Sequence, residues 1–443
     1  MLQTQLTTFQ AKILIGIFLF LLLTPIRSIA IMVSPLFVYG IYCLHHFKVQ
    51  RGTEWLFVLW GGTSLIGILN ETTNWQNVLV SAIILLPMLY LFFIKPQRGL
   101  SLFTVNFSLL QRMMLYILIP INILGGICWV KSGMLGDAWG IPYGSHYETV
   151  HGLAMINIYV LFYLGLQLFH GKRDLKTIAL FTFFLVSLFG CQYGLGMICL
   201  FVSVLAYLLI SGRFKTVALA LIVTMLGSWL LTLDAFEYER ANIMKAESNR
   251  DDARKVEMFT DFFNNVSHNM TLCVAGTGAG GYNSRSALIL SPDFTNSFKN
   301  ILGTSAPPYF KKYIYKLWNK KFVSQNSFTD GTRNKPYSSM VALWAEHGTF
   351  FFVLFCSLLY KNYKDLTKYK KKQEFLYQYI LLLDMFMIVS LVSHLWLETS
   401  EFMVYALIRF VCLAKITNEK TINHSVHNFL AQHIPSPPKI SPS

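Results

Sequence analysis

The sequence predicts an all-α polytopic membrane protein of about 12 transmembrane helices, with one large loop folded as a mostly helical cap. Of its 443 residues, 54% are hydrophobic and only 13% are charged, whereas soluble domains carry roughly 25% charged residues. Apolar runs follow one another along most of the chain, and the one long polar segment among them is residues 234–335. This pattern favours a water-soluble cap on a bundle of membrane helices.

Each predicted span is an apolar run, because a helix needs about 20 mostly apolar residues to cross the hydrocarbon core. Several runs are shorter, which leaves the count open by one pair. Pro25 and Arg27 separate the first two runs, which also fit a signal-anchor hairpin. The candidate spans are residues 11–24, 28–44, 55–70, 78–94, 113–130, 153–169, 177–191, 195–210, 217–233, 338–360, 377–393 and 402–412 with its flanks.

Lysine and arginine in the short loops determine the predicted orientation, because these residues favour the cytoplasmic side of a membrane. Most of them fall on one side of a twelve-span chain, and the opposite short loops hold only Arg27 and Lys131. Both termini are therefore predicted to be cytoplasmic, and the large loop to face outward. The net charge of +15 largely follows from this topology, so we expect no nucleic acid partner.

This topology divides the chain into four parts. Residues 1–233 hold spans one to nine, 234–337 form the large loop, 338–417 hold the last three spans, and 418–443 form a cytoplasmic tail. Of the 7 cysteines, only Cys273 lies in the large loop, so neither a disulfide framework nor a zinc cluster is predicted there. The outward segments contain no Asp-x-Asp pair, and we expect no metal or cofactor.

The first helix predicted in the large loop has an apolar stripe and a polar face. Ser248-Asn-Arg-Asp251 provides the hydroxyl and the carboxylate of a helix start. The apolar residues at helical spacing are Ala253, Val256, Phe259, Phe263 and Val266. The polar face, spaced by three or four residues, consists of Arg250, Arg254, Glu257 and Asp261. A solvated, salt-bridged face and a substrate-binding face both fit this pattern.

A glycine-rich turn follows in the same loop, with the sequence Gly276-Thr-Gly-Ala-Gly-Gly281. The spacing matches a dinucleotide fingerprint, but the strand and helix of a βαβ unit are not evident around it. Its backbone amides are predicted to form a nest for an anion such as phosphate. A plain flexible turn is the alternative.

Residues 308–322 have the pattern of an amphipathic helix. One face is apolar and carries Tyr309, Phe310, Tyr313, Ile314, Leu317 and Trp318. Lysines occupy the flanks and the opposite face: Lys311, Lys312, Lys316, Lys320 and Lys321. Such a helix is typical of the membrane interface. Anchoring of the cap and binding of a lipid-linked pyrophosphate are both compatible with it.

Ionisable residues near the outer ends of the last spans are further site candidates. Tyr337 precedes a span that carries Glu346 and His347, and ionisable groups below the interface usually face a cavity or a partner. His394, Glu398 and Glu401 gather at the outer end of the last pair of spans, whereas Arg409 lies deeper and is expected to snorkel. The outward loop at residues 131–150 either folds over the bundle or simply connects two spans.

These features resemble the superfamily of O-antigen polymerases and O-antigen ligases. The shared pattern is about a dozen spans with cytoplasmic ends, a large periplasmic loop late in the chain, an arginine on that loop's first helix, a glycine-rich turn and a Glu-x-Gly in the next span. Here these are Arg254, Gly276-Thr-Gly and Glu346-His347-Gly348. The match covers the architecture throughout, and individual residues only from about 191 to 351.

The resemblance implies a metal-independent glycosyltransferase in the bacterial inner membrane. Such a polymerase joins undecaprenyl-pyrophosphate-linked oligosaccharide repeat units into O-antigen or capsule-type polysaccharide at the periplasmic face. Its partners are the lipid-linked oligosaccharide and the bilayer, with room for a chain-length regulator.

The chemistry of that reaction assigns roles to the candidate residues. Charge builds on the departing pyrophosphate, so fixed cations are needed around it, and arginine binds phosphate oxygens in pairs. Arg254 and then Arg250 are the expected catalytic cations, and Glu346, His347 or Glu398 is expected to act as the base. The remaining predicted substrate contacts are Arg285, Arg333, Lys335, Gly276, Gly278 and Tyr337.

Departures from the ligase pattern favour a polymerase. Ligases carry a histidine at the end of the large loop, where this chain has Tyr337-Ser338, and an arginine after a glutamine at an outer helix end, where this chain has Gln192-Tyr193. Ligase-like transfer of the glycan to another acceptor is one alternative. A polysaccharide or lipid transporter or flippase is another, and it predicts broken helices with polar groups at mid-membrane.

Overall fold

The structure is a computed structural model that describes residues 2–45, 48–95, 107–133, 136–144, 148–211, 237, 240–241, 244, 254–294, 297–325, 335–370 and 374–433. The regular elements in these ranges are helices, apart from the antiparallel pair β1 (Lys48–Val49) and β2 (Ile94–Lys95). The predicted helical fold class is confirmed.

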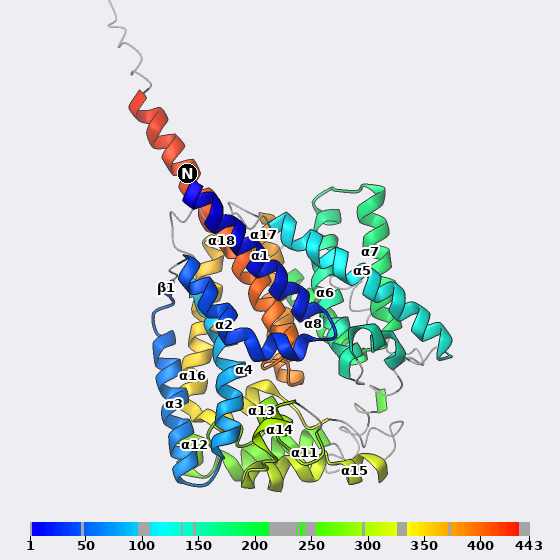
Figure 1. Cartoon of the computed structure of the whole chain (residues 1–443), viewed down its shortest axis with the longest axis vertical. Coiled ribbons are helices and arrows are strands. Elements are labelled where there is room, and N and C mark those ends of the chain that lie inside the picture. The colour runs from blue at the N-terminus through cyan, green and yellow to red at the C-terminus, as the bar shows by residue number, and fades with distance from the viewer. Residues whose placement is uncertain are drawn as a thin grey trace, which may run out of the picture.

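Long helices form a bundle that makes up most of the molecule (Figure 1). They are α1 (Leu2–Leu23), α2 (Arg27–His45), α3 (Thr53–Leu69), α4 (Trp75–Phe93), α5 (Phe107–Lys131), α6 (Glu148–Phe169), α7 (Leu175–Gly190), α8 (Gly194–Ser211), α16 (Ser339–Thr367), α17 (Glu374–Ser393) and α18 (Ser400–His433).

Each predicted span lies within one of these helices with at most one residue outside it, and several helices extend well beyond the predicted ends; residues 217–233 lie outside the described part of the chain. Among the described helices, 5 are both long and apolar enough to cross a membrane: α4, α5, α6 without its first residue, α16 and α17. Shorter apolar helices accompany them in α1, α2, α3, α7 and α8. The chain is therefore a membrane protein; the count of twelve spans and the orientation remain predictions.

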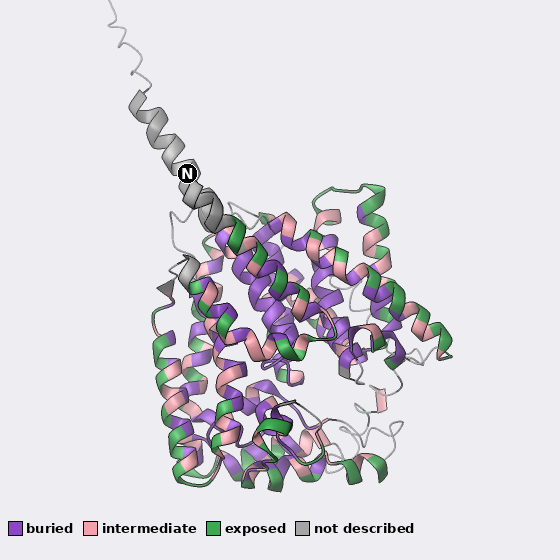
Figure 2. Ribbon diagram, in the orientation of Figure 1, coloured by how far each residue is buried: buried purple, intermediate pink, exposed green. Residues whose placement is uncertain are grey.

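Helix α18 is the centre of the bundle. From Phe402 to Cys412 all of its side chains are buried, and it packs against α1, α2, α4, α5, α6 and α17. A mostly apolar helix that is buried around its whole circumference is stable only when neighbours surround it. The outer helices differ, because they expose large apolar side chains such as Phe20, Trp55 and Tyr116, and exposed residues follow their outward faces (Figure 2). These faces fit a lipid environment.

Arg409 of α18 does not snorkel as the sequence suggested. It is 3% exposed and its Nε donates to the Asp384 carboxylate of α17 at 3.1 Å. The hydroxyl of Tyr405 donates to the same oxygen at 2.7 Å. The correction has a simple cause: an acid on the neighbouring helix provides the counter-charge inside the bundle, so the guanidinium has no need to reach the membrane surface.

Short helices from the large loop form the cap at one end of the bundle, beside α3, α4 and α16 (Figure 1). They are α11 (Arg254–Asp261), the π-helix η4 (Phe262–Val266), α12 (Met270–Ala275), α13 (Arg285–Ile289), α14 (Ser297–Leu302), the π-helix η5 (Phe310–Ile314), the 3₁₀-helix η6 (Tyr315–Leu317) and α15 (Lys320–Gln325). The predicted helix start at 248–251 lies outside the described residues.

The apolar stripe predicted for the first cap helix is wrong in part. Met258, Phe262 and Val266 are the residues buried in the cap core, whereas Phe263 is 45% exposed. These three residues recur every four positions, and the chain passes from α-helix to π-helix at Phe262. The wider turn shifts the buried face by one residue from the pattern that regular α-helical spacing predicts.

The membrane-interface role predicted for residues 308–322 is also corrected. Phe310, Ile314 and Leu317 are buried in the cap's own core, in one cluster with Phe262 and Tyr282. The segment is a π-helix followed by a 3₁₀-helix, with its lysines exposed. Its apolar face therefore stabilises the cap from within, which leaves no broad apolar face for lipid.

The loop between α5 and α6 folds onto the bundle as the 3₁₀-helix η1 (Gly136–Tyr143). Trp139 is buried against α5 and α7, where a Cβ at Gly125 or Gly190 would meet its ring or backbone within 2.5 Å. Tyr143 is fully buried and donates to Glu401 at 3.2 Å. Arg27 stacks on the Tyr143 ring at 4.3 Å, which gives this basic residue at the turn between α1 and α2 a structural role.

Candidate functional site

The glycine-rich turn wraps around the carboxylate of Glu346. Oε1 accepts hydrogen bonds from the backbone amides of Tyr282 (3.0 Å), Asn283 (3.1 Å) and Ser284 (3.0 Å), and Oε2 accepts one from Gly280 (2.7 Å). Glu346 is 2% exposed. The turn is thus an anion-binding nest, as its glycine pattern predicts, and the anion is a side chain of the same protein. We call this arrangement the Glu346 nest.

Close backbone contacts require glycine around the Glu346 nest. Gly276 has φ +71° and Gly348 has φ +74°, both in the left-handed region, which favours glycine. A Cβ at Gly276 would lie 2.4 Å from the Glu346 carbonyl, and one at Gly348 would lie 2.0 Å from the Val274 carbonyl oxygen. The Gly278 amide donates to the Glu346 carbonyl at 2.8 Å. Gly348 also interrupts the helical geometry of α16, so the turn and the helix break interlock.

The same turn docks on the bundle through the loop between α3 and α4. The hydroxyls of Thr72 and Thr73 donate to the carbonyls of Thr277 (2.8 Å) and Ala279 (2.7 Å). Gly67 of α3 lies against the turn, because a Cβ there would be 2.6 Å from the Thr277 carbonyl oxygen. The phosphate-binding role predicted for Gly276 and Gly278 remains a prediction; their amides donate to the carbonyls of Leu272 and Glu346.

A second buried carboxylate, Glu398, lies in the loop between α17 and α18 and binds the start of α13. Its Oε2 accepts the Ser286 amide at 2.9 Å. Burial, and next the negative charge of Glu346, raise the pKa of Glu398 to about 8, against the opposing effects of the Ser286 amide and Arg285. Glu398 therefore holds a proton near neutral pH that an exposed glutamate would release.

A small cavity of about 20 Å³ brings four predicted site residues together: Arg285, Glu346, His347 and Glu398. This volume is the space open to the centre of a water-sized sphere, and roughly 10–15 Å³ of it is enough to hold one water molecule. The cavity therefore has room for a water but not for a sugar. His347 is 1% exposed, hydrogen-bonds Thr63 of α3 at 3.1 Å and packs on Phe351. These residues join the cap to the bundle.

We expect Glu398→Gln to remove a pH dependence of stability. In the folded protein Glu398 stays protonated between pH 4.5, the ordinary pKa of a glutamate, and about pH 8. Its contribution to the free energy of unfolding is therefore fully present below pH 4.5 and is lost as the pH rises through 8. Wild type should lose on the order of a few kcal/mol across this window, and the variant much less. Thermal unfolding in detergent from pH 5 to 8.5 measures it, with exposed Glu374→Gln as the control; parallel wild-type and Glu398→Gln profiles would contradict the expectation.

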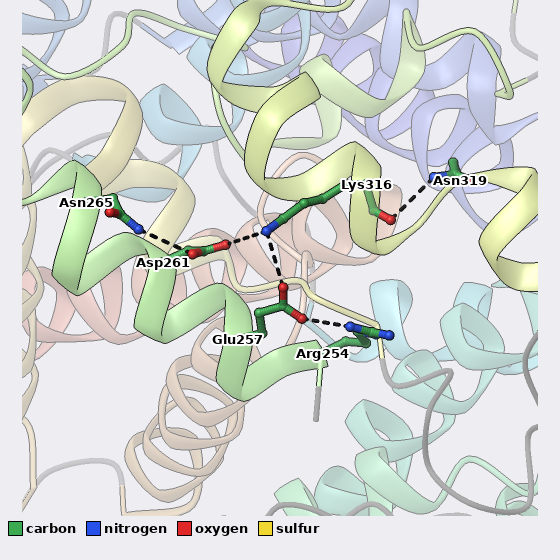
Figure 3. A network of polar contacts seen from close by, with 6 residues as sticks. All are labelled: Arg254, Glu257, Asp261, Asn265, Lys316 and Asn319. Atoms are coloured by element: carbon green, nitrogen blue, oxygen red, sulfur yellow. Dashed lines mark hydrogen bonds and ion pairs between the residues drawn. The ribbon is translucent and has the colours of Figure 1, made fainter. Parts of the chain in front are cut away.

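Arg254, the first residue of α11, takes part in a network of charges on the cap (Figure 3). Its Nη1 donates to Glu257 at 2.8 Å, and Lys316 of η6 bridges Glu257 (3.2 Å) and Asp261 (3.1 Å). Its guanidinium also stacks on the Phe322 ring at 4.5 Å. The salt-bridged face that the sequence suggested is present, and Arg254 remains 22% exposed at its edge.

Lys255, which the sequence analysis did not single out, reaches from the cap to the bundle. Its Nζ donates to the Ser393 carbonyl at the end of α17. The pKa of Lys255 is lowered to about 8, chiefly by burial; Cys199 opposes this shift and the positive charge of Lys335 adds to it. Burial raises the pKa of Asp137, and the positive charge of Lys335, which lies 5.8 Å from the Trp318 ring centroid, partly opposes that rise. We call Lys255 and Lys335, together with Arg254, which is next to Lys255 in the sequence, the cationic cluster.

A row of aromatic rings extends from the bundle to this cluster. His151 of α6 stacks on Tyr193 with centroids 4.4 Å apart. The row continues through Trp396, His394, Tyr337 and Trp318, with successive centroids 6.1, 5.4, 5.6 and 6.2 Å apart. Lys335 lies over its last ring. We call these six residues the aromatic row; its members come from five distant stretches of sequence, so no local pattern reveals it.

The structure thus separates the predicted residues into two groups. Arg285, Glu346, His347 and Glu398 surround the small cavity, whereas Arg254, Lys335 and Tyr337 belong to the cationic cluster and the aromatic row. Arg250 and Arg333 lie outside the described residues. In the described ranges there is no group of three His, Cys, Asp or Glu side chains suited to a metal ion.

No family model matches this chain, and no curated protein matches it. The class of the protein therefore rests on its fold and composition, which define a helical membrane protein with a folded polar loop.

Proposed function

We propose that this protein polymerises undecaprenyl-pyrophosphate-linked oligosaccharide repeat units at the periplasmic face of a bacterial inner membrane. The observation that carries the proposal is the cationic cluster beside the aromatic row, where the cap meets the bundle. Lys335 lies close enough to Lys255 for its positive charge to lower the pKa of Lys255. An anion between them would relieve that repulsion, and a pyrophosphate is an anion of suitable charge.

The proposed reaction is a glycosyl transfer. A hydroxyl of the acceptor repeat unit attacks the anomeric carbon of the growing chain, a glycosidic bond forms, and the bond from that carbon to the pyrophosphate oxygen breaks. Undecaprenyl pyrophosphate leaves with the bonding electrons, and the cationic cluster stabilises its charge. The partly exposed end members of the aromatic row, His151 and Trp318, offer rings for sugars to pack on, while the four rings between them are buried.

Glu398 is the base that we favour among the predicted candidates. The Glu346 carboxylate already accepts four backbone amides, whereas a pKa of about 8 suits Glu398 to proton transfer near neutral pH. Glu398 also follows His394 and Trp396 of the aromatic row on the same short loop. The proton of the attacking hydroxyl would pass to Glu398 in the fraction of molecules in which this carboxyl is ionised, a fraction that grows as the pH approaches its pKa of about 8, through a water where direct contact is not made.

Purified protein reconstituted with lipid-linked repeat units tests the proposal. A polymerase yields a ladder of longer lipid-linked chains without any lipid A core. Product formed only after a core acceptor is added would instead indicate a ligase. Absence of any lengthening under both conditions would refute glycan transfer with these substrates.

A transporter or flippase is the second candidate, and two observations favour it. Helix α16 is broken at Gly348, and a charged pair, Asp384 with Arg409, lies inside the bundle. Broken helices and buried charges are typical of transporters. Vesicles that move the lipid-linked unit between leaflets without lengthening it would favour this candidate.

A further inference from the structure

A second cavity of about 270 Å³ lies among α4, α16, α17 and α18. Its walls are mostly apolar, and it includes Tyr360 and Ile388, which are 66% and 42% exposed. Both belong to helices that can span a membrane, so the cavity opens between α16 and α17 toward lipid. An apolar cavity of about 150 Å³ already binds benzene; this one has room for a stretch of hydrocarbon chain.

The cavity also contains an unpartnered hydrogen-bond donor. Asn362 is 8% exposed, and its Nδ2 has no hydrogen-bond partner among the described residues. The other polar side chain deep in the wall, Asp384, is already bound to Arg409 and Tyr405. An amide in an apolar site is costly without an acceptor. A ligand oxygen at the edge of a hydrocarbon chain, such as an ester carbonyl, would satisfy it.

Lysines surround the same end of α16. Lys364 is exposed and follows Tyr360 by four residues, which puts both on one face of the helix about 6 Å apart along its axis. Lys361 lies one residue beyond Tyr360, and its Nζ donates to the Arg51 carbonyl at 3.1 Å. Lysines beside a cavity between helices attract anionic headgroups.

We propose that this cavity binds one acyl chain of an anionic phospholipid from the leaflet at the lysine-rich end of α16. The chain occupies the apolar cavity, Asn362 donates to the ester carbonyl, and Lys364 contacts the phosphate. The site is separate from the cationic cluster and does not depend on the proposed polymerase activity. By the predicted orientation this leaflet is the cytoplasmic one.

Native mass spectrometry of the full chain, with phosphatidylglycerol or phosphatidylcholine added to the detergent, tests the site. Wild type should retain phosphatidylglycerol with a roughly fivefold preference, the value expected from one lysine near the phosphate. Ile388→Trp fills the exposed opening and should abolish the adduct. Val392→Trp is the matched control, because Val392 is 47% exposed, lies one turn further along α17 and does not line the cavity. An adduct retained by Ile388→Trp as in wild type would overturn the proposal.

Two further variants distinguish the contact with the lipid headgroup from the contact near the acyl chain. Lys364→Gln should remove the preference for phosphatidylglycerol, whereas Lys370→Gln, at another exposed lysine, should keep it. Asn362→Leu should lower retention without lowering the Tm of the lipid-free protein, which distinguishes a binding role from a folding role. Equal retention of both phospholipids by wild type, or displacement of phosphatidylglycerol by equimolar undecaprenyl phosphate, would overturn the assignment to an anionic phospholipid.

Discussion

Replacing Glu346 with alanine is expected to detach the cap from the bundle. The change leaves four buried backbone amides without an acceptor, and each unsatisfied group costs about 1–3 kcal/mol. Their sum is comparable to the whole stability of an ordinary domain, about 5–15 kcal/mol. Limited proteolysis of detergent-solubilised protein should therefore show a cap that is cut readily, and the thermal midpoint should fall steeply.

Glu346→Gln is the informative companion to this variant. The glutamine oxygen can replace Oε1 and keep three of the amides, while its NH₂ group would face the Gly280 amide, donor against donor. We expect intermediate stability, with transfer activity that follows the folded fraction. Glu257→Ala, which loses only partly exposed ion pairs worth about 0–1 kcal/mol, is the stability control. A stable Glu346→Gln protein without turnover would instead assign Glu346 a catalytic role.

Arg254→Ala is expected to abolish long-chain glycan while the protein still inserts and folds. Loss of one fixed group that stabilises charge in a transition state costs roughly 100- to 1,000-fold in rate, whereas the ion pair with Glu257 is partly exposed and contributes little to stability. Chain-length ladders on a gel, together with the amount of protein in the membrane, measure the effect. A ladder of wild-type length would refute the proposed role.

Glu257→Ala separates a structural role of Arg254 from an electrostatic one. It removes the same ion pair but keeps the guanidinium, so a structural role predicts that both variants lose activity. A role in binding pyrophosphate predicts that Glu257→Ala remains active, because the cation is then freer to bind phosphate. Lys255→Met should resemble Arg254→Ala if the cationic cluster binds the leaving group, and Lys321→Met on the exposed face of α15 should not.

Apolar runs predicted the helices because burial in lipid or in a bundle requires the same composition along the whole segment. The partners of the helices were not predictable in this way. The amphipathic segment at 308–322 has an apolar face in either setting, and only the folded cap shows that Phe310 and Ile314 pack against protein instead of lipid. Arg409 likewise needed its partner Asp384, which lies on another helix.

The type of site could be predicted from the sequence, but most of the contacts between its residues could not. The glycines at 276–281 predicted an anion nest, and the structure contains one, but the carboxylate comes from Glu346, more than sixty residues further along the chain. Lys255 was missed because a lysine next to an arginine at a helix start normally faces water. The aromatic row escaped because its residues lie far apart in sequence and meet only when cap and bundle are assembled.

The Glu346 nest also imposes an order on biosynthesis. The glycine turn leaves the ribosome well before Glu346, and Glu398 follows only after α17 has been made. We therefore expect the nascent chain to lack an acceptor for the amides that these carboxylates bind until Glu346 and then Glu398 have been made, and the cap to close late in assembly. Truncation before α17 would leave a protein without Glu398, the second carboxylate that binds the cap. Quality-control proteases can distinguish such a form from the finished protein.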